Sequence, residues 1–153
     1  MTTDQNKITA RRVVEEGFNK RDLKVLDEVY SKDAINHDPQ QPNAGTGPEA
    51  VRKSMSTWLV AFPDVKLTIE HEIAEGDFVV QRLKSTGTNT GSLTGMPATG
   101  KKTTINGVMT SKFKDGKIVE SWALFDQLSL LQQLGAIPTE PAAATREPVL
   151  AAR

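Results

Sequence analysis

The sequence predicts an α+β fold in which three helices precede a single curved antiparallel sheet of about four to five strands, with a short helix at the end. Apolar residues recur at helical spacing as far as residue 62, and from Val65 onward they alternate with polar residues at the period of a strand. Gly76-Asp77 and Asp115-Gly116 are tight-turn signals that would join neighbouring strands as hairpins. A sheet wrapped around helices would enclose a cavity between the two layers, and such cavities are usual ligand sites.

Each of the three expected helices presents an apolar stripe. Asp22 can cap the second helix. Gly47-Pro48-Glu49 is typical of a helix start, since proline suits the first helical position and glutamate favours the positive end of the helix dipole. Pro63 ends the third helix. The stripes consist of Ile8, Val14 and Phe18 in the first helix, Leu23, Leu26, Val29 and Tyr30 in the second, and Val51, Met55, Trp58 and Phe62 in the third.

Four longer strands are expected after the helices, and a short extended segment at 34–39 is a candidate for a fifth. On the third of the longer strands, Ile105, Met109 and Phe113 lie on one side. Gly135 stands where a helix C-cap is expected, so the final helix ends there. The longer strands cover 66–75, 78–88, 103–114 and 118–125, and the final helix covers 127–134.

The length of 153 residues is that of one domain. A chain of this size can bury roughly 68–70% of its unfolded surface, so it needs no disulfide or metal in order to fold. We expect a single domain at 1–138 and a flexible tail at 139–153, where Pro, Ala and Thr are frequent.

The composition excludes several classes of function. Nineteen basic residues balance nineteen acidic ones, so the net charge is zero and nucleic acid is not an expected partner. The absence of cysteine excludes a disulfide scaffold, thiolate zinc sites and cysteine catalysis. The N-terminus is polar, unlike a secretory signal, and every apolar run is too short to span a membrane. We therefore expect a cytoplasmic protein with no membrane partner.

Asp126 is the most informative candidate for chemistry. By strand alternation it shares the side of Ile118, Trp122 and Leu124, provided that no bulge intervenes, and that side would face the core. A carboxylate in apolar surroundings can serve as a proton acceptor near neutrality. Alternatively, Asp126 could be the N-cap of the final helix, which would stabilise the anion instead. The residues alone leave both roles open.

Two further polar residues are candidates for a substrate pocket. His37 could hydrogen-bond a substrate oxygen as a neutral imidazole, or be a partly exposed residue of a turn-rich segment. Arg82 shares strand parity with Phe78 and Val80, and it could hold a carboxylate or carbonyl oxygen or extend into solvent from a sheet edge. No metal site is expected, because His37 and His71 are the only histidines and neither has a second ligand at metal spacing.

Four large apolar residues complete the set of candidate pocket residues. Trp58, Phe62, Met109 and Trp122 are most simply core residues, and some of them would also be walls if the interior holds a pocket. If they instead pack against one another and leave no cavity, the protein would be a dimeric scaffold. Sequence alone does not separate pocket from core at these positions.

Five short motifs and a longer closing run occur in an order that is more specific than any of them alone. The motifs are Asn36-His37-Asp38-Pro39, Ala61-Phe62-Pro63-Asp64, Gly87-Thr88-Asn89-Thr90-Gly91, Pro97-Ala98-Thr99-Gly100-Lys101 and Asp115-Gly116-Lys117-Ile118. The closing run is Glu120-Ser121-Trp122, Asp126-Gln127-Leu128 and Leu131-Gln132-Gln133-Leu134-Gly135. Over roughly residues 8–138, the chain resembles the SnoaL-like polyketide cyclases (ester cyclases) of the nuclear-transport-factor-2-like superfamily.

This resemblance implies a cone-shaped α+β barrel with three helices that commonly dimerises through the outer face of the sheet. It implies intramolecular aldol condensation of a polyketide methyl ester, or of a related small apolar or polycyclic carbonyl compound, with no metal or organic cofactor. It also implies that Asp126 is the acid/base residue. Asp126 would remove a proton next to two carbonyls, and the protonated acid would return that proton to the alkoxide formed on ring closure.

The chain departs from the family pattern in two places. Asn89 stands where members often have histidine, and no histidine follows His71, although the characterised cyclases use one near the aspartate. An oxyanion partner would have to come from elsewhere, with His37, Arg82 or a water as candidates. Two alternatives to a cyclase are therefore open: a non-catalytic small-molecule-binding module, and another superfamily activity such as isomerase, dehydratase or hydrolase.

Overall fold

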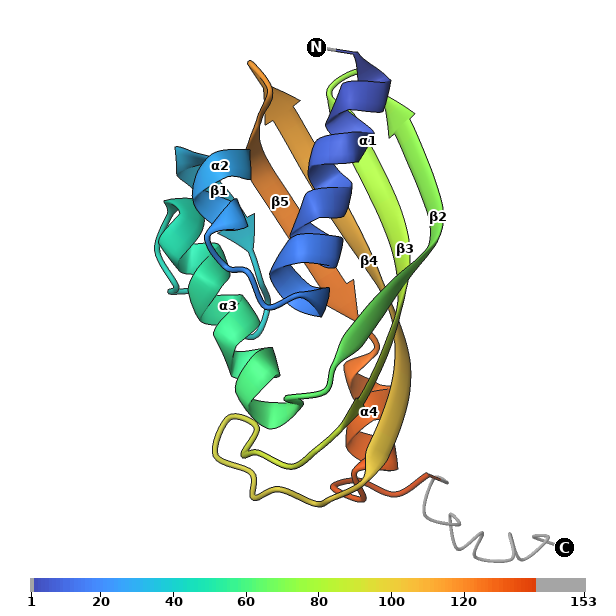
Figure 1. The fold of residues 1–153 in the computed structure, drawn as a ribbon. Coiled ribbons are helices and arrows are strands. Elements are labelled where there is room, and N and C mark those ends of the chain that lie inside the picture. The colour runs from blue at the N-terminus through green and yellow to red at the C-terminus, as the bar shows by residue number, and fades with distance from the viewer. Residues whose placement is uncertain (1, 140–153) are drawn as a thin grey trace, which may run out of the picture.

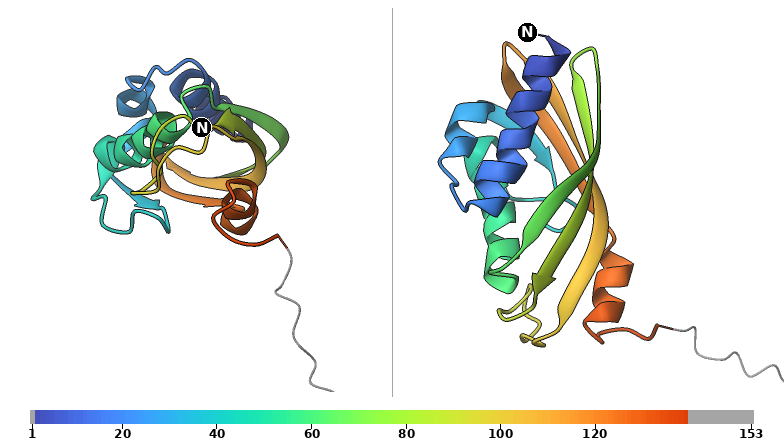
Figure 2. Two further views of the ribbon diagram at one scale, coloured as in Figure 1. Left: turned by 90° about the horizontal axis from the view of Figure 1, so that it is seen from below. Right: turned by 45° about the vertical axis from the view of Figure 1, so that its right-hand side comes forward.

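A five-stranded sheet forms the frame of the computed structural model, which describes residues 2–139, and helices lie across its concave face (Figure 1). The strands are ordered β1-β5-β4-β3-β2, and the sheet stays open between β1 and β2. Figure 2 shows how it curves around the helices. The elements are α1 (Thr3–Arg12), η1 (Val13–Asn19), α2 (Val25–Val29), β1 (Tyr30–His37), α3 (Gly47–Ala61), β2 (Lys66–Glu75), β3 (Phe78–Thr88), β4 (Lys102–Lys114), β5 (Lys117–Phe125) and α4 (Gln127–Gln133).

The α+β class and the strand count are confirmed, but the sheet is mixed rather than wholly antiparallel. β2, β3, β4 and β5 form the predicted antiparallel meander, whereas β1 pairs in parallel with β5. Tight hairpin turns set the direction of β2 against β3 and of β4 against β5, and Gly76, Asp115 and Gly116 all adopt the positive φ that such turns require. No turn joins β1 to β5, so no local signal sets the direction of that pair.

The first predicted helix is divided, and its predicted stripe is wrong at one position. The α-helix gives way to a π-helical segment at Val13, and Ile8 is 57% exposed. Ile8 and Val14 are six residues apart, which places them about 120° apart around a helix with 3.6 residues per turn, too far for one buried stripe. The buried residues of α1 and η1 follow the correct spacing and are Asn6, Ala10, Val13, Val14, Gly17 and Phe18.

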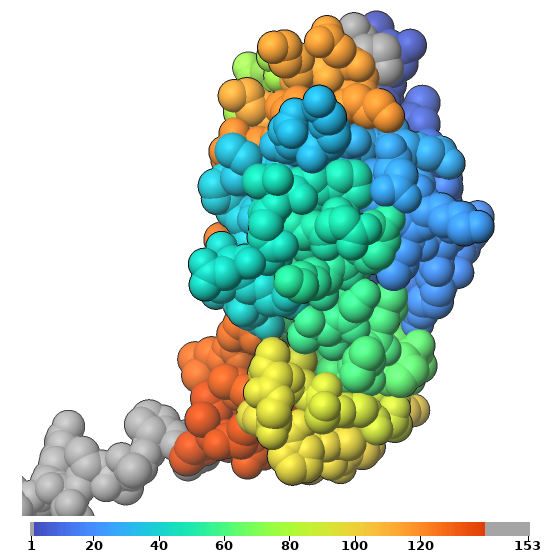
Figure 3. All heavy atoms as spheres, turned by 90° about the vertical axis from the view of Figure 1, so that its left-hand side faces the viewer, coloured from blue at the N-terminus to red at the C-terminus, as the bar shows by residue number. Residues whose placement is uncertain are grey.

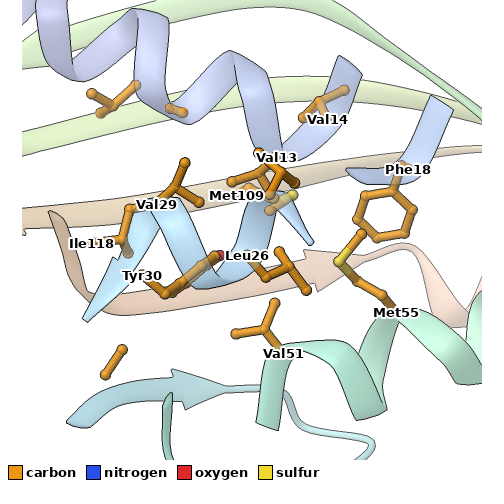
Figure 4. Packing of buried hydrophobic residues seen from close by; sticks show 14 of the residues in the cluster. Val13, Val14, Phe18, Leu26, Val29, Tyr30, Val51, Met55, Met109 and Ile118 are labelled. Carbon is orange, nitrogen blue, oxygen red and sulfur yellow. The ribbon is translucent and has the colours of Figure 1, made fainter. Parts of the chain in front are cut away.

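Two apolar clusters hold the helices to the sheet. The larger lies between η1, α2, α3 and the concave face of the sheet, where Val13, Phe18, Tyr30, Met55 and Met109 face one another (Figure 4). The smaller surrounds α4 and the end of α3, and it consists of Ala61, Phe62, Val65, Leu93, Ile105, Leu130 and Leu134. Beside the larger cluster the interior is not completely filled.

The loop between β3 and β4 lies beside α3 and α4 at one end of the molecule (Figure 3). Asn89, only 1% exposed, organises it. Its Nδ2 donates to the carbonyls of Ala61 (3.2 Å) and Gly91 (2.9 Å), and its Oδ1 accepts from the backbone N (2.9 Å) and Oγ1 (3.0 Å) of Thr99. Asn89, at which this chain departs from the family pattern, is therefore a structural residue whose hydrogen bonds hold the loop against the end of α3.

Of the predicted tail at 139–153, all but residue 139 lies outside the described residues. Among residues 2–139, none of the helices has the length and apolar character needed to cross a bilayer.

Candidate functional site

A cavity of about 150 Å³ lies between η1, β1, α3 and the β4–β5 part of the sheet. Its wall is mostly apolar, and its rim reaches the surface at Pro39 and Leu124, which are both exposed. The volume is about half of the ~300 Å³ at which typical small-molecule sites begin, and it matches a cavity that holds one benzene ring. The apolar lining residues are Val13, Phe18, Pro39, Val51, Met55, Trp58, Met109, Trp122, Ala123, Leu124 and Phe125.

Three of the four predicted apolar wall residues line this cavity. They are Trp58, Met109 and Trp122. Phe62 does not line it: Phe62 is 2% exposed within the smaller cluster and stacks on Trp58 with ring centroids 5.8 Å apart. Phe62 therefore supports the wall from behind.

Gly107 makes room for the ring of Phe125, which forms another part of the wall. The two residues are directly paired between β4 and β5. A Cβ at position 107 would lie 2.3 Å from Cδ1 of Phe125, far closer than any van der Waals contact. The absence of a side chain at this inward-facing position lets the ring lie over β4, where its centroid is 6.0 Å from that of Trp58.

Polar side chains occupy one part of the cavity wall. Ser121 Oγ donates to Asn36 Oδ1 at 2.9 Å, and Asn36 Nδ2 donates to Ser54 Oγ at 3.3 Å. The Tyr30 hydroxyl adjoins Ser121. Burial raises the pKa of Tyr30 to about 12, and the hydrogen bond with Ser121 only partly opposes that shift, so the phenol is neutral at physiological pH. These four groups come from β1, α3 and β5 and are all uncharged.

Asp38 is the one carboxylate that lines the cavity within residues 2–139. It is half-buried just after β1, and its Oδ1 accepts from the backbone N of Gln40 at 2.9 Å. Gln127, the first residue of α4, lines the same cavity, and its Nε2 is buried with no hydrogen-bond partner in the described part of the chain. The cavity thus combines apolar walls, a single carboxylate and several neutral hydrogen-bonding groups.

His37 lies outside the cavity, contrary to its predicted place in the pocket. Strand alternation places Asn36 and Asp38 toward the interior and His37 on the opposite side of β1. There its Nε2 is 2.9 Å from Oε1 of Glu120, and its ring stacks on Trp122 with centroids 5.1 Å apart. Its two neighbours, Asn36 and Asp38, and not the histidine, line the cavity.

Asp126 is exposed, so its predicted inward-facing position is wrong. A register irregularity pairs Phe113 with Ile118 but Lys112 with Glu120, and this bulge changes which β5 residues face inward. Ser121, Ala123 and Phe125 line the cavity as a result. The capping alternative is confirmed, because the Asp126 side chain accepts from the backbone N of Ser129 at 3.0 Å.

Arg82 is also outside the cavity. The buried residues of β3 are Val79, Gln81, Leu83 and Ser85, so the parity that Arg82 shares with Phe78 and Val80 belongs to the outer face of the sheet. Its side chain is 50% exposed, with Nε 3.6 Å from Oε1 of Glu70. Phe78 and Val80, which share this face with Arg82, are themselves partly exposed.

Sequence reasoning missed the polar residues of the site. Asn36 and Asp38 belong to the Asn36-His37-Asp38-Pro39 motif, and strand alternation from the buried Ala34 places both of them on the inward side. Tyr30 and Ser54 carry no comparable signal, since each lies in an apolar helix stripe or beside one. Within residues 2–139 no group of three or more His, Cys, Asp or Glu side chains is arranged to hold a metal ion.

Comparison with known proteins connects this geometry to a family. The sequence model of the SnoaL-like polyketide cyclases matches residues 8–134. The chain belongs to this family. It is 34% identical over 110 residues to the aklanonic acid methyl ester cyclase DnrD of Streptomyces peucetius, a match that covers 71% of this chain and 72% of that protein. The corresponding cyclase DauD of Streptomyces sp. strain C5 is 33% identical over 113 residues, covering 72% and 67%.

Solved structures agree with the assignment to the SnoaL-like family. AclR, a proposed hydroxylase of Streptomyces galilaeus, superposes with a TM-score of 0.79 at 28% identity, over 92% of this chain and 87% of that one. IdmH, a proposed polyketide cyclase of Streptomyces antibioticus, has a TM-score of 0.71 at 29% identity, over 84% and 97%. Membership in this family supports a cyclase-type function and a small carbonyl compound as the type of ligand.

Proposed function

We propose that this SnoaL-like protein is a cyclase-type enzyme that transfers protons on a carbonyl compound held in the cavity. The observation that carries the proposal is the lining: apolar walls surround one carboxylate and a group of neutral hydrogen-bond donors. A carboxylate acts as general base on a carbon next to a carbonyl, while neutral donors stabilise the charge that develops on oxygen. A protein that only binds an apolar compound would need the apolar walls but not the carboxylate.

In the proposed reaction Asp38 removes a proton from the carbon next to a carbonyl, and the bonding electrons move to the carbonyl oxygen as an enolate. The enolate carbon attacks a ketone in the same molecule, which forms the new carbon–carbon bond and an alkoxide. Protonated Asp38 then returns its proton to the alkoxide, so the carboxylate is regenerated. These steps require no metal or organic cofactor.

Asp126 is the competing candidate for the base, because the family resemblance assigns that role to it. To act in the cavity it would have to release the backbone N of Ser129 and turn inward past Gln127. Asp38 needs no such movement, since it already lines the cavity. We therefore favour Asp38.

The size of the cavity limits the size of the substrates that it can enclose. With about 150 Å³ of space, it accommodates a single ring or a short chain bearing a carbonyl. A polycyclic substrate would have to extend through the rim at Pro39 and Leu124. We propose a small carbonyl compound as the substrate class.

Deuterium exchange tests this function directly. Acetophenone, a single-ring ketone with exchangeable methyl protons, is incubated with the protein in deuterated buffer, and its methyl signal is followed by proton NMR. We expect the signal to decay at a rate proportional to protein concentration. Binding without exchange above the buffer rate would contradict the enzyme and favour a non-catalytic binding module.

The outer face of the sheet supports a further proposal, that the protein is a homodimer. Val108 lies between Arg82 and Leu124 in the strand register, within a partly apolar patch that also includes Phe78, Val80 and Trp122. Leu124, which is 64% exposed, extends this patch, and contiguous exposed apolar patches mark sites of protein–protein contact.

We expect Val108→Glu to convert the dimer into a monomer, because a carboxylate at the centre of an interface loses its hydration when the interface closes, which is strongly unfavourable. Light scattering after gel filtration measures the mass. Ile8→Glu, a matched change on exposed α1, should leave the mass unchanged. A wild-type protein that is monomeric at all concentrations would contradict the dimer.

A further inference from the structure

Four uncharged side chains on the cavity wall form a continuous hydrogen-bonded chain. Tyr30 adjoins Ser121, Ser121 Oγ donates to Asn36 Oδ1 at 2.9 Å, and Asn36 Nδ2 donates to Ser54 Oγ at 3.3 Å. All four side chains line the cavity. They come from β1, β5 and α3, so the chain crosses between three elements that are far apart in sequence.

The hydroxyl protons of this chain do not all find acceptors. Ser121 gives its proton to Asn36, so its oxygen accepts from Tyr30, and Asn36 in turn gives an amide proton to Ser54. The hydroxyl proton of Ser54 then has no acceptor within residues 2–139. Thr57, on the same helix, behaves differently, because its hydroxyl donates to the carbonyl of Lys53 at 3.2 Å.

Turning the Asn36 amide by 180° does not remove this imbalance. Its oxygen would then accept from Ser54, its nitrogen would donate to Ser121, and Ser121 would donate to Tyr30. The unmatched proton would move to the Tyr30 hydroxyl at the other end of the chain. In either orientation one hydroxyl donor remains free, and both ends of the chain lie on the cavity.

We infer that this hydrogen-bonded chain of side chains binds the carbonyl oxygen of the substrate and stabilises the enolate formed from it. Either Tyr30 or Ser54 is the donor that contacts the oxygen. The inference rests on the proposed function. A ligand oxygen completes the hydrogen bonding of the chain, and neutral donors in apolar surroundings bind it more strongly than they would in water. The hydrogen-bonded side chains would thereby stabilise the oxyanion in place of a histidine, which does not occur after His71 in this sequence.

Acetophenone and ethylbenzene test this inference, because they differ only in that the carbonyl group of acetophenone is a methylene group in ethylbenzene. Binding is measured by quenching of the fluorescence of Trp58 and Trp122, which both line the cavity. The variants are Tyr30→Phe, Ser54→Ala and the double variant. The matched control is Ser56→Ala, two residues along α3 and outside the cavity lining.

In the double variant we expect the affinity for acetophenone to fall about tenfold and that for ethylbenzene to stay the same. Whichever single variant loses more affinity for acetophenone identifies the residue, Tyr30 or Ser54, that donates to the carbonyl oxygen. Infrared spectra of carbonyl-labelled acetophenone give a second readout. The carbonyl stretch should shift to lower frequency on binding to the wild type and return toward its value in an apolar solvent in the double variant.

Equal carbonyl frequencies in the wild type and the folded double variant would overturn the inference. So would a wild-type frequency equal to that in an apolar solvent, a result that requires no variant. A shifted carbonyl without deuterium exchange would instead overturn the proposed enzyme and leave the binding role of the chain intact. Failure of both ligands to bind would overturn both proposals.

Discussion

Asp38→Asn is expected to lower the deuterium exchange rate of acetophenone by about 10²- to 10⁴-fold, the contribution typical of a positioned general base. The amide keeps the size of the side chain and can still accept from the backbone N of Gln40, so the fold should be retained. An amide cannot take the substrate proton, however. The rate is measured by NMR as for the wild type, after thermal unfolding has shown that the variant is folded.

Two further variants make this result decisive. Asp33→Asn, an exposed carboxylate on β1, the strand that Asp38 follows, is the matched control and should leave the rate unchanged. Asp126→Asn should retain the α4 cap, because asparagine caps helices as well as aspartate does. A large loss of rate in Asp126→Asn with none in Asp38→Asn would assign the base to Asp126, as the family resemblance implies.

Asn89→Ala is expected to destabilise the fold by about 3 kcal/mol, the largest stability effect that we predict for a polar side chain. The change removes four hydrogen bonds and leaves the buried carbonyl of Ala61 and the partly buried carbonyl of Gly91 without that donor. Urea unfolding followed by tryptophan fluorescence measures the difference in the free energy of unfolding.

Asn106→Ala is the control for this change, since Asn106 lies on the exposed face of β4. It should alter the free energy of unfolding by less than about 0.5 kcal/mol. If Asn89→Ala were as mild as the control, the loop between β3 and β4 would not depend on the Asn89 network.

The strands of the meander were predicted almost to the residue because their signals are local. Alternation marks each strand, and Gly76 and Asp115-Gly116 mark the turns between them. Which side faces inward was less predictable. On β4 the predicted set of Ile105, Met109 and Phe113 is buried. On β5 a bulge gives Ser121 and Phe125 the inward orientation that alternation from Ile118 predicts for Trp122 and Leu124, although the latter two also contribute to the cavity lining.

The sequence by itself determined the fold class, the order of the elements and the family, because these depend on periodicity, turn residues and short motifs read along one chain. Only the tertiary structure decided which groups meet in the cavity. Tyr30 and Asn36 meet Ser121 through the parallel pairing of β1 with β5, and Ser54 joins them when α3 packs against β1. Such contacts between distant segments depend on register and packing, which no local pattern encodes. For the same reason Asp38, and not Asp126, is the carboxylate that lines the cavity.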